Sequence, residues 1–228
     1  MLAGHYVTAV IANQKMPGRS LLFFLVACQA QDLLWMTFHY LGLESTEPSD
    51  ALDTTISGLA VDMMYSHDLL PQALWATLFL VLGSAMFKDV KVGLMGAALV
   101  AGHAALDAIS GFPHHVFGED SHPVGLGLYA SRPYLAVFIE AVFVVVAGWY
   151  YFDQQARAGV QHTPLQKWSI IGILTYAMVF MAFTATVSLR EWFGIPEFDV
   201  GFNTSVPTLI FTYLSMMLVL FLATPRTR

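Results

Sequence analysis

Long apolar segments follow one another along most of the chain, and short polar stretches separate them. Six segments approach the ~20 apolar residues that a helix needs to cross a bilayer. They cover roughly residues 20–42, 69–87, 92–111, 133–152, 168–189 and 206–223. The alternating segments of ~10 residues typical of a membrane β-barrel are not found. The pattern predicts an all-α fold class, a polytopic transmembrane helix bundle with about six spans.

The first 18 residues are too short to form another span. Residues 5–14 are apolar enough for a helix, and Met16-Pro17-Gly18 is a turn signal. We therefore expect an N-terminal half-membrane helix that turns into the first span; a terminus lying on the membrane surface is the alternative. The basic region and cleavage site of a signal peptide are missing, so we expect none to be removed.

No connection is long enough to fold alone, so residues 1–228 are predicted to form a single transmembrane domain. Residues 1–152 contain every ionisable residue that lies deep in a span. The spans within residues 153–228 contain none between Trp168 and Leu189 or between Val206 and Ala223. We expect these last helices to be scaffold that faces lipid or a second copy of the chain.

Composition and charge agree with a membrane protein and give it an orientation. The chain is 57% hydrophobic, with a mean hydropathy of +0.62. Eight of its ten basic residues fall on one side of the six-span arrangement, and only Arg132 and Arg190 fall on the other. The eight are Lys15, Arg19, Lys88, Lys91, Arg157, Lys167, Arg226 and Arg228. The positive-inside rule then predicts an inner-membrane protein with both termini in the cytoplasm.

The opposite side is acidic, which disfavours nucleic acid as a partner there. Its acidic residues are Glu44, Glu47, Asp50, Asp53, Glu119, Asp120, Glu191, Glu197 and Asp199. The single cysteine, Cys28, lies inside the first span. One cysteine excludes an intramolecular disulfide and a thiolate metal site of the zinc-finger kind.

Four ionisable residues lie deep in the predicted spans: Asp32, His103, Asp107 and Glu140. Counted at ~1.5 Å per residue, Asp32, His103 and Glu140 all lie roughly 18–20 Å from the cytoplasmic edge. His5 would reach ~17 Å if the N-terminal helix forms. Asp107 follows one helical turn beyond His103 on the same face. Several segments therefore bring imidazoles and carboxylates to one plane, a ligand set that suits Zn, Mn or Fe.

Each of these residues also has a simpler interpretation. His103 and Asp107 could form a hydrogen bond within one helix. Asp32 could pair with a neighbouring glutamine or belong to a proton path. Glu140 could be a polar contact between helices. Their shared depth favours a single metal site over several unrelated polar contacts.

Four short motifs resemble the bacterial membrane-bound metal-dependent hydrolases, the family of the LexA-binding inner-membrane-associated hydrolases. Tyr65-Ser66-His67-Asp68-Leu69-Leu70 resembles the T/Y-S-H-S-L-L motif, and Gly102 to Asp107 resembles G/S-H-x-x-x-D. Residues 31–35 resemble an L-P-D-[IL]-D segment, and residues 123–129 are similar to a V-G-L-G-L-W stretch. Asp68 stands where the family usually has Ser. Order and spacing fit over residues 5–140, about 60% of the chain.

The resemblance implies five metal ligands: His5, Asp32, His67, His103 and Asp107. We expect one or two divalent ions, with zinc as the expected metal. Asp68 or Glu140 would orient a ligand imidazole or act as general base. His114, His115 and Arg132 could contact an anionic head group. The hypothesis is an integral membrane hydrolase that cleaves a phosphoester of a lipid or another amphipathic substrate near the outer leaflet.

Three other functions compete with the hydrolase. A proton- or cation-coupled transporter or channel would use the intramembrane carboxylates. A haem-binding protein would use paired histidines. A structural or partner-binding membrane protein would need none of this chemistry.

Overall fold

Apolar helices of membrane-spanning length form the bundle in the computed structural model, which describes residues 1–198 and 201–225. Within those residues, five helices are long and apolar enough to cross a membrane, and a bent pair makes up to six. The five are α5 (Leu69–Phe87), α6 (Val90–Ser110), α8 (Pro133–Arg157), α9 (Pro164–Phe183) and α11 (Ser205–Ala223). Only 22–39% of each apolar window is buried inside the protein, so most of this surface faces outward, as lipid contact requires. The predicted all-α polytopic bundle is confirmed.

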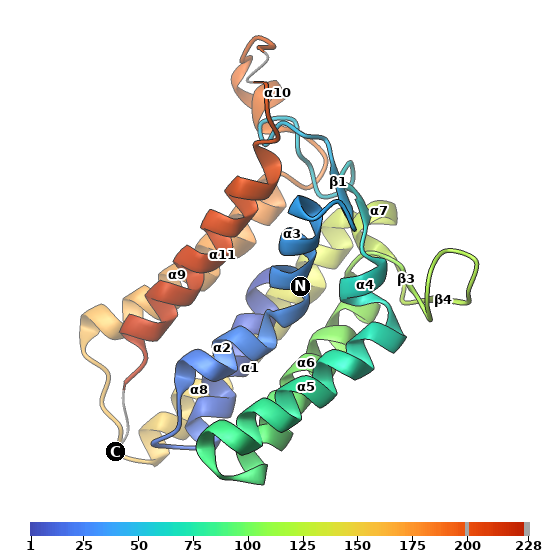
Figure 1. Cartoon of the computed structure of the whole chain (residues 1–228). Helices are drawn as coiled ribbons and strands as arrows, with labels where there is room; N and C mark the ends of the chain where they lie inside the picture. Colours follow the sequence, from blue (N-terminus) through green and yellow to red (C-terminus); the bar gives the residue numbers. More distant parts are fainter. Residues whose placement is uncertain (199–200, 226–228) are drawn as a thin grey trace.

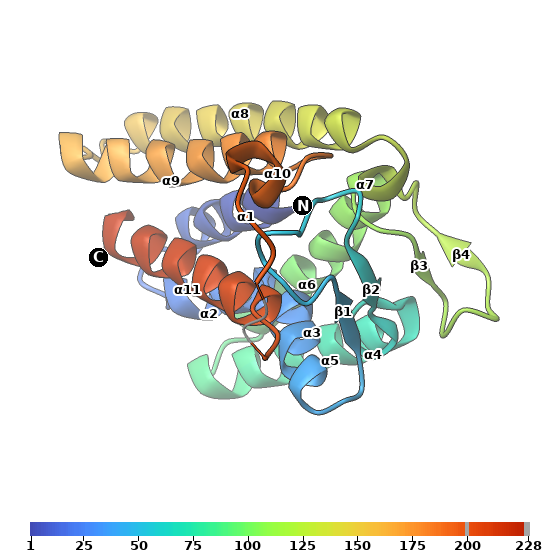
Figure 2. The ribbon, with the colours of Figure 1, turned by 90° about the horizontal axis from the view of Figure 1, so that it is seen from above.

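The helices pack in three layers (Figures 1 and 2). The α5–α6 hairpin forms one outer layer and the α8–α9 pair the other. Between them lie α1 (Leu2–Lys15) and α2 (Leu21–Cys28), with α11 beside α2 and α9. The N-terminal helix α1 is therefore an interior element. Nine of its residues are buried, including His5.

The first predicted span is broken, which corrects the expectation of one continuous helix over 20–42. Helices α2 and α3 (Ala30–Tyr40) meet at Gln29 with a bend of 63°. The polar side chains at the break bond to other helices. Gln29 Nε2 donates to the Leu2 carbonyl at 3.3 Å, and Gln31 Nε2 donates to the Val100 carbonyl at 2.8 Å. These hydrogen bonds satisfy polar groups at the break, which would be unfavourable without partners in the hydrocarbon region.

Helices α5 and α6 approach closely where two glycines meet. A Cβ atom on Gly93 would lie 2.2 Å from the carbonyl oxygen of Leu80, and one on Gly83 would lie 2.8 Å from Gly93 Cα. Neither position has room for a side chain. This contact fixes α6, which holds two of the predicted metal ligands.

The turns at 16–20, 88–89 and 158–163 lie at one end of the bundle (Figure 1). We call it the basic end because the described basic residues on this side lie in these turns or within four residues of them: Lys15, Arg19, Lys88, Lys91, Arg157 and Lys167. An ion pair between Arg19 and Asp89 at 2.7 Å joins two of these turns. The opposite end, the loop end, consists of residues 41–68, 111–132 and 184–198. Three charged residues used in the orientation argument, Asp199, Arg226 and Arg228, lie outside the described residues.

Short elements build the loop end. They are β1 (Ser45–Glu47), β2 (Ala60–Asp62), α4 (Met64–His67), β3 (His114–His115), β4 (Pro123–Val124), α7 (Leu128–Ser131) and α10 (Leu189–Phe193). β1 pairs with β2, and β3 with β4, both antiparallel. Backbone bonds from Ile56 and Ser57 to the carbonyls of Thr184 and Ala185 tie the segment before β2 to the end of α9.

Candidate metal centre

Three imidazoles and two carboxylates from four helices meet inside the bundle. His5 comes from α1, Asp32 from the first turn of α3, His67 from the end of α4, and His103 and Asp107 from α6. Each residue is at most 7% exposed. They form two overlapping groups, His5–His103–Asp107 and Asp32–His67–His103, and within each group the ligand atoms lie within 4.8 Å of one another. The five expected ligands are brought together, and these buried groups could hold a metal ion.

His103 is the member shared by both groups. Its Nε2 lies 3.0 Å from Asp107 Oδ2 and 3.8 Å from Asp32 Oδ2. On one side Asp107 Oδ1 lies 3.2 Å from His5 Nε2, and on the other Asp32 Oδ1 lies 3.4 Å from His67 Nε2. The amino group of Met1 also contacts Asp107 and His5. Each carboxylate therefore stands between two imidazoles.

The break in the first span orients the His103 ring. Its Nδ1 lies 2.8 Å from the carbonyl oxygen of Cys28, the last residue of α2. A carbonyl can only accept, so Nδ1 carries a proton; in the neutral imidazole, Nε2 then presents a lone pair to the two carboxylates. In that neutral state, this buried Nε2 has no proton to donate to Asp107 Oδ2, 3.0 Å away, and no hydrogen-bond partner among the described residues. An unpaired imidazole nitrogen beside two carboxylates fits a site for a cation, because a buried lone pair without a partner is otherwise unfavourable.

The His67 ring is held from its other side by Ser66, which lies in the quoted motif but was given no role there, and by Glu44, which no motif indicated. Ser66 Oγ lies 2.7 Å from His67 Nδ1 and donates to Glu44 Oε2 at 2.9 Å. Glu44 is only 5% exposed, and burial raises its pKa above the ordinary value. In the sequence Glu44 is one of several acidic residues in a polar segment outside the spans, so nothing distinguished it from a solvated surface charge.

Asp68 and Glu140, the expected base or orienting carboxylates, lie outside both groups of ligand atoms. Asp68 accepts the backbone N–H groups of His115 at 2.8 Å and Gly118 at 2.6 Å. Glu140 accepts the N–H of Gly4 at 3.1 Å and the hydroxyl of Tyr129 at 3.1 Å. With these contacts Asp68 anchors the loop after α6, and Glu140 anchors the start of α1. The catalytic role expected for them stays a prediction.

Of the three residues expected to contact a head group, only His114 approaches the centre. Its ring stacks on His67 with 5.2 Å between the ring centroids, and its Nε2 has no partner among the described residues. Burial, with repulsion from His67, lowers the pKa of His114 to about 3, so its imidazole is neutral near pH 7. The side chains of His115, half-buried, and Arg132, exposed, are not part of the cavity lining described next.

A cavity of about 160 Å³ adjoins the centre on the side of the loop end. The carboxylates and imidazoles in its lining are Asp32, His67, Asp107 and His114. Most of the remaining wall is apolar, including Trp35, Leu59, Met63, Phe112, Phe180, Met181, Leu209 and Tyr213. Four of these side chains come from α9 and α11. The helices expected only as scaffold therefore form one wall of the cavity, which their purely apolar sequences did not reveal.

Comparisons with protein-family models, with curated proteins and with solved structures gave no match. The candidate function therefore depends on the geometry of the centre and its cavity.

Proposed function

We propose that this protein is an integral membrane metal-dependent hydrolase that cleaves a phosphoester of a lipid or another amphipathic substrate. The observation that carries the proposal is the convergence of five buried metal-ligand side chains at the end of a largely apolar cavity. The resemblance of residues 5–140 to membrane-bound metal-dependent hydrolases agrees with it. Orientation by the positive-inside rule puts the termini in the cytoplasm and the cavity near the outer leaflet.

The donor set fits one or two zinc ions. His5, His67 and His103 would supply nitrogen, and Asp32 and Asp107 would supply oxygen, the ligands that catalytic zinc uses in place of thiolate. Since Nδ1 of His103 donates a hydrogen bond to the backbone carbonyl of Cys28, only Nε2 remains to bind a metal, and His103 can bind only one ion. A bound divalent ion would supply Lewis acidity and a water of lowered pKa.

The cavity supports an amphipathic substrate. A polar group cleaved at the centre would lie beside His67 and His114, while an attached apolar chain would lie against residues such as Phe180, Met181 and Leu209. Neutral His114 can donate or accept a hydrogen bond to a phosphate oxygen. The apolar wall would exclude bulk water from the reacting groups, which strengthens electrostatic interactions there.

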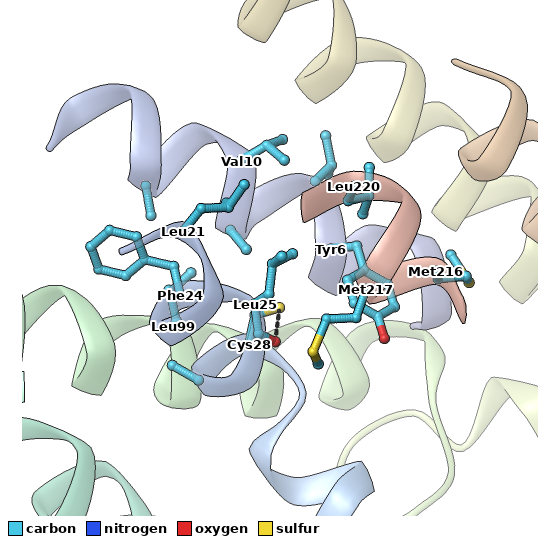
Figure 3. Close-up of a cluster of buried hydrophobic side chains, with 14 of the residues drawn as sticks. Tyr6, Val10, Leu21, Phe24, Leu25, Cys28, Leu99, Met216, Met217 and Leu220 are labelled. Atoms are coloured by element: carbon cyan, nitrogen blue, oxygen red, sulfur yellow. Dashed lines mark hydrogen bonds between the residues drawn. The ribbon is translucent and has the colours of Figure 1, made fainter. Parts of the chain in front are cut away.

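The packing between the centre and the basic end favours a hydrolase over a transporter. Figure 3 shows part of a cluster of buried apolar side chains from this region, among them Val10, Phe24, Leu25 and Leu220. A transporter needs a polar route to both faces of the membrane, and this cluster offers none.

The arrangement of the rings disfavours haem. The rings of His5 and His103 stack face to face, with 3.6 Å between centroids and 9° between planes. Bis-histidine ligation requires the two imidazoles to approach opposite faces of the macrocycle through their nitrogens. Stacked rings cannot do this.

Metal analysis and a hydrolysis assay on the purified full chain test the proposal. We expect zinc in the wild-type protein and its loss in His103→Ala and Asp107→Ala, with His115→Ala as the matched histidine control that keeps it. Phospholipid or isoprenoid-phosphate hydrolysis should disappear with a chelator and return with Zn²⁺. Unchanged metal content in both centre variants would overturn the proposal.

A further inference from the structure

A chain of hydrogen bonds leads from Glu44 through Ser66 to His67. Glu44 Oε1 accepts the backbone N–H groups of Tyr65 and Ser66, each at 2.7 Å, and its Oε2 accepts the Ser66 hydroxyl at 2.9 Å. Three donors thus fix a buried carboxylate in one orientation. Ser66 itself is fully buried.

The protons available to these hydrogen bonds determine the tautomer of His67. A serine hydroxyl has one proton, and the carboxylate at 2.9 Å is a nearer and stronger acceptor than the Met63 carbonyl at 3.5 Å. Once that proton points to Glu44, Ser66 Oγ can only accept from His67 Nδ1 at 2.7 Å. His67 is then protonated on Nδ1, and in the neutral imidazole its Nε2 faces Asp32 with a free lone pair.

We propose that Glu44 is a positioning residue that acts through Ser66 to hold His67 in the tautomer and orientation needed to bind a metal. The proposal rests on the proposed function, because it assumes that His67 is a ligand. Without the carboxylate, the Ser66 hydroxyl is free to donate to Nδ1. The imidazole proton then moves to Nε2, where it blocks the lone pair that would bind the ion.

A purely structural role for Glu44 makes a different prediction. Glu44 accepts two backbone N–H groups and so holds the first turn of α4. If this were its whole role, the Ser66 hydroxyl would not be needed. Ser66→Ala keeps those backbone contacts and removes only the link to His67. Glu44→Gln keeps an oxygen for the backbone but turns an amide donor toward Ser66, which leaves the hydroxyl proton to His67.

Metal affinity of the metal-free full chain in detergent separates the two roles, with Zn²⁺ measured by competition with a chelator and Co²⁺ by its visible spectrum. We expect Ser66→Ala and Glu44→Gln each to weaken Zn²⁺ binding by about 10–100-fold and to alter the Co²⁺ bands. Glu47→Gln, which neutralises an exposed acid three residues away, should behave as wild type.

Wild-type affinity and spectra in both Ser66→Ala and Glu44→Gln would overturn the positioning role, and wild-type behaviour in Glu44→Gln alone would remove Glu44 from it. His103→Ala distinguishes this failure from that of the proposed function. If His103→Ala binds no metal, the centre stands whatever Glu44 does. If it binds as wild type, the metal centre itself is wrong and the inference falls with it.

Discussion

Replacement of Glu140 tests whether this buried carboxylate anchors α1 or takes part in the reaction. Glu140 is fully buried and accepts hydrogen bonds from Gly4 N–H and Tyr129 O–H. Gly4 lies in the first turn of α1, where a backbone N–H has no acceptor within the helix. Glu140→Leu keeps a similar volume and removes both acceptors.

The size of the effect follows from these two donors. A buried donor left without an acceptor costs about 1–3 kcal/mol, so two cost roughly 2–6 kcal/mol. Burying a carboxylate is itself unfavourable, and its removal offsets part of this loss. We therefore expect Glu140→Leu to lower the free energy of unfolding by about 2–4 kcal/mol and to reduce metal content by loosening His5. Glu140→Gln keeps an oxygen for Gly4 and gives Tyr129 an amide donor. Its free energy of unfolding should therefore fall by about 1 kcal/mol or less.

Unfolding of the detergent-solubilised protein in denaturant, followed by circular dichroism, measures the stability of each variant beside its zinc content and hydrolysis rate. Wild-type stability in Glu140→Leu would refute the anchoring argument. A Glu140→Gln protein with normal stability and zinc but no hydrolysis would instead assign the carboxylate a direct part in the reaction.

Three further substitutions test the packing, the loop and the cavity. Gly93→Ala would put a Cβ 2.2 Å from a backbone carbonyl of α5 and should lower the unfolding free energy by about 1–3 kcal/mol. Gly102→Ala, on the same helix with nothing within 4 Å, is its control, and equal stability of the two variants would contradict the close packing. Asp68→Ala should speed hydrogen exchange in residues 114–127 without loss of zinc; lost zinc with unchanged exchange would make Asp68 a ligand. Leu209→Trp should obstruct the cavity and reduce lipid hydrolysis at unchanged zinc content, and an unchanged rate would place the substrate elsewhere.

The fold was predictable because lipid imposes a strict length on apolar helices. The predicted span 69–87 coincides with α5. The predicted spans 92–111, 133–152, 168–189 and 206–223 correspond to α6, α8, α9 and α11, with ends that differ by at most six residues. The break at Gln29 was not predictable in the same way. Hydropathy reports which residues face lipid, whereas the break is stabilised by hydrogen bonds to Leu2 and Val100, residues distant in sequence.

The convergence at the centre was partly predictable because depth in a membrane can be counted. His5, Asp32, His103 and Glu140 were expected in one plane, and the structure brings the first three into the two groups of candidate ligands. Counting gives depth but not the direction of a side chain or its bonds. It could not show that both oxygens of Glu140 are bonded to Gly4 and Tyr129.

The residues that orient the candidate ligands were the least predictable part of the centre, for a physical reason. A ligand needs a particular side chain at a particular depth, but an orienting acceptor can be any oxygen that reaches the second imidazole nitrogen. For His103 it is the backbone carbonyl of Cys28, freed where α2 ends, which no residue type encodes. For His67 it is the Ser66 hydroxyl, backed by Glu44 from a polar loop. In the neutral state of His67 and His103, these two acceptors favour the proton on the nitrogen that faces away from the centre, and a cation between the two imidazoles would require this common arrangement.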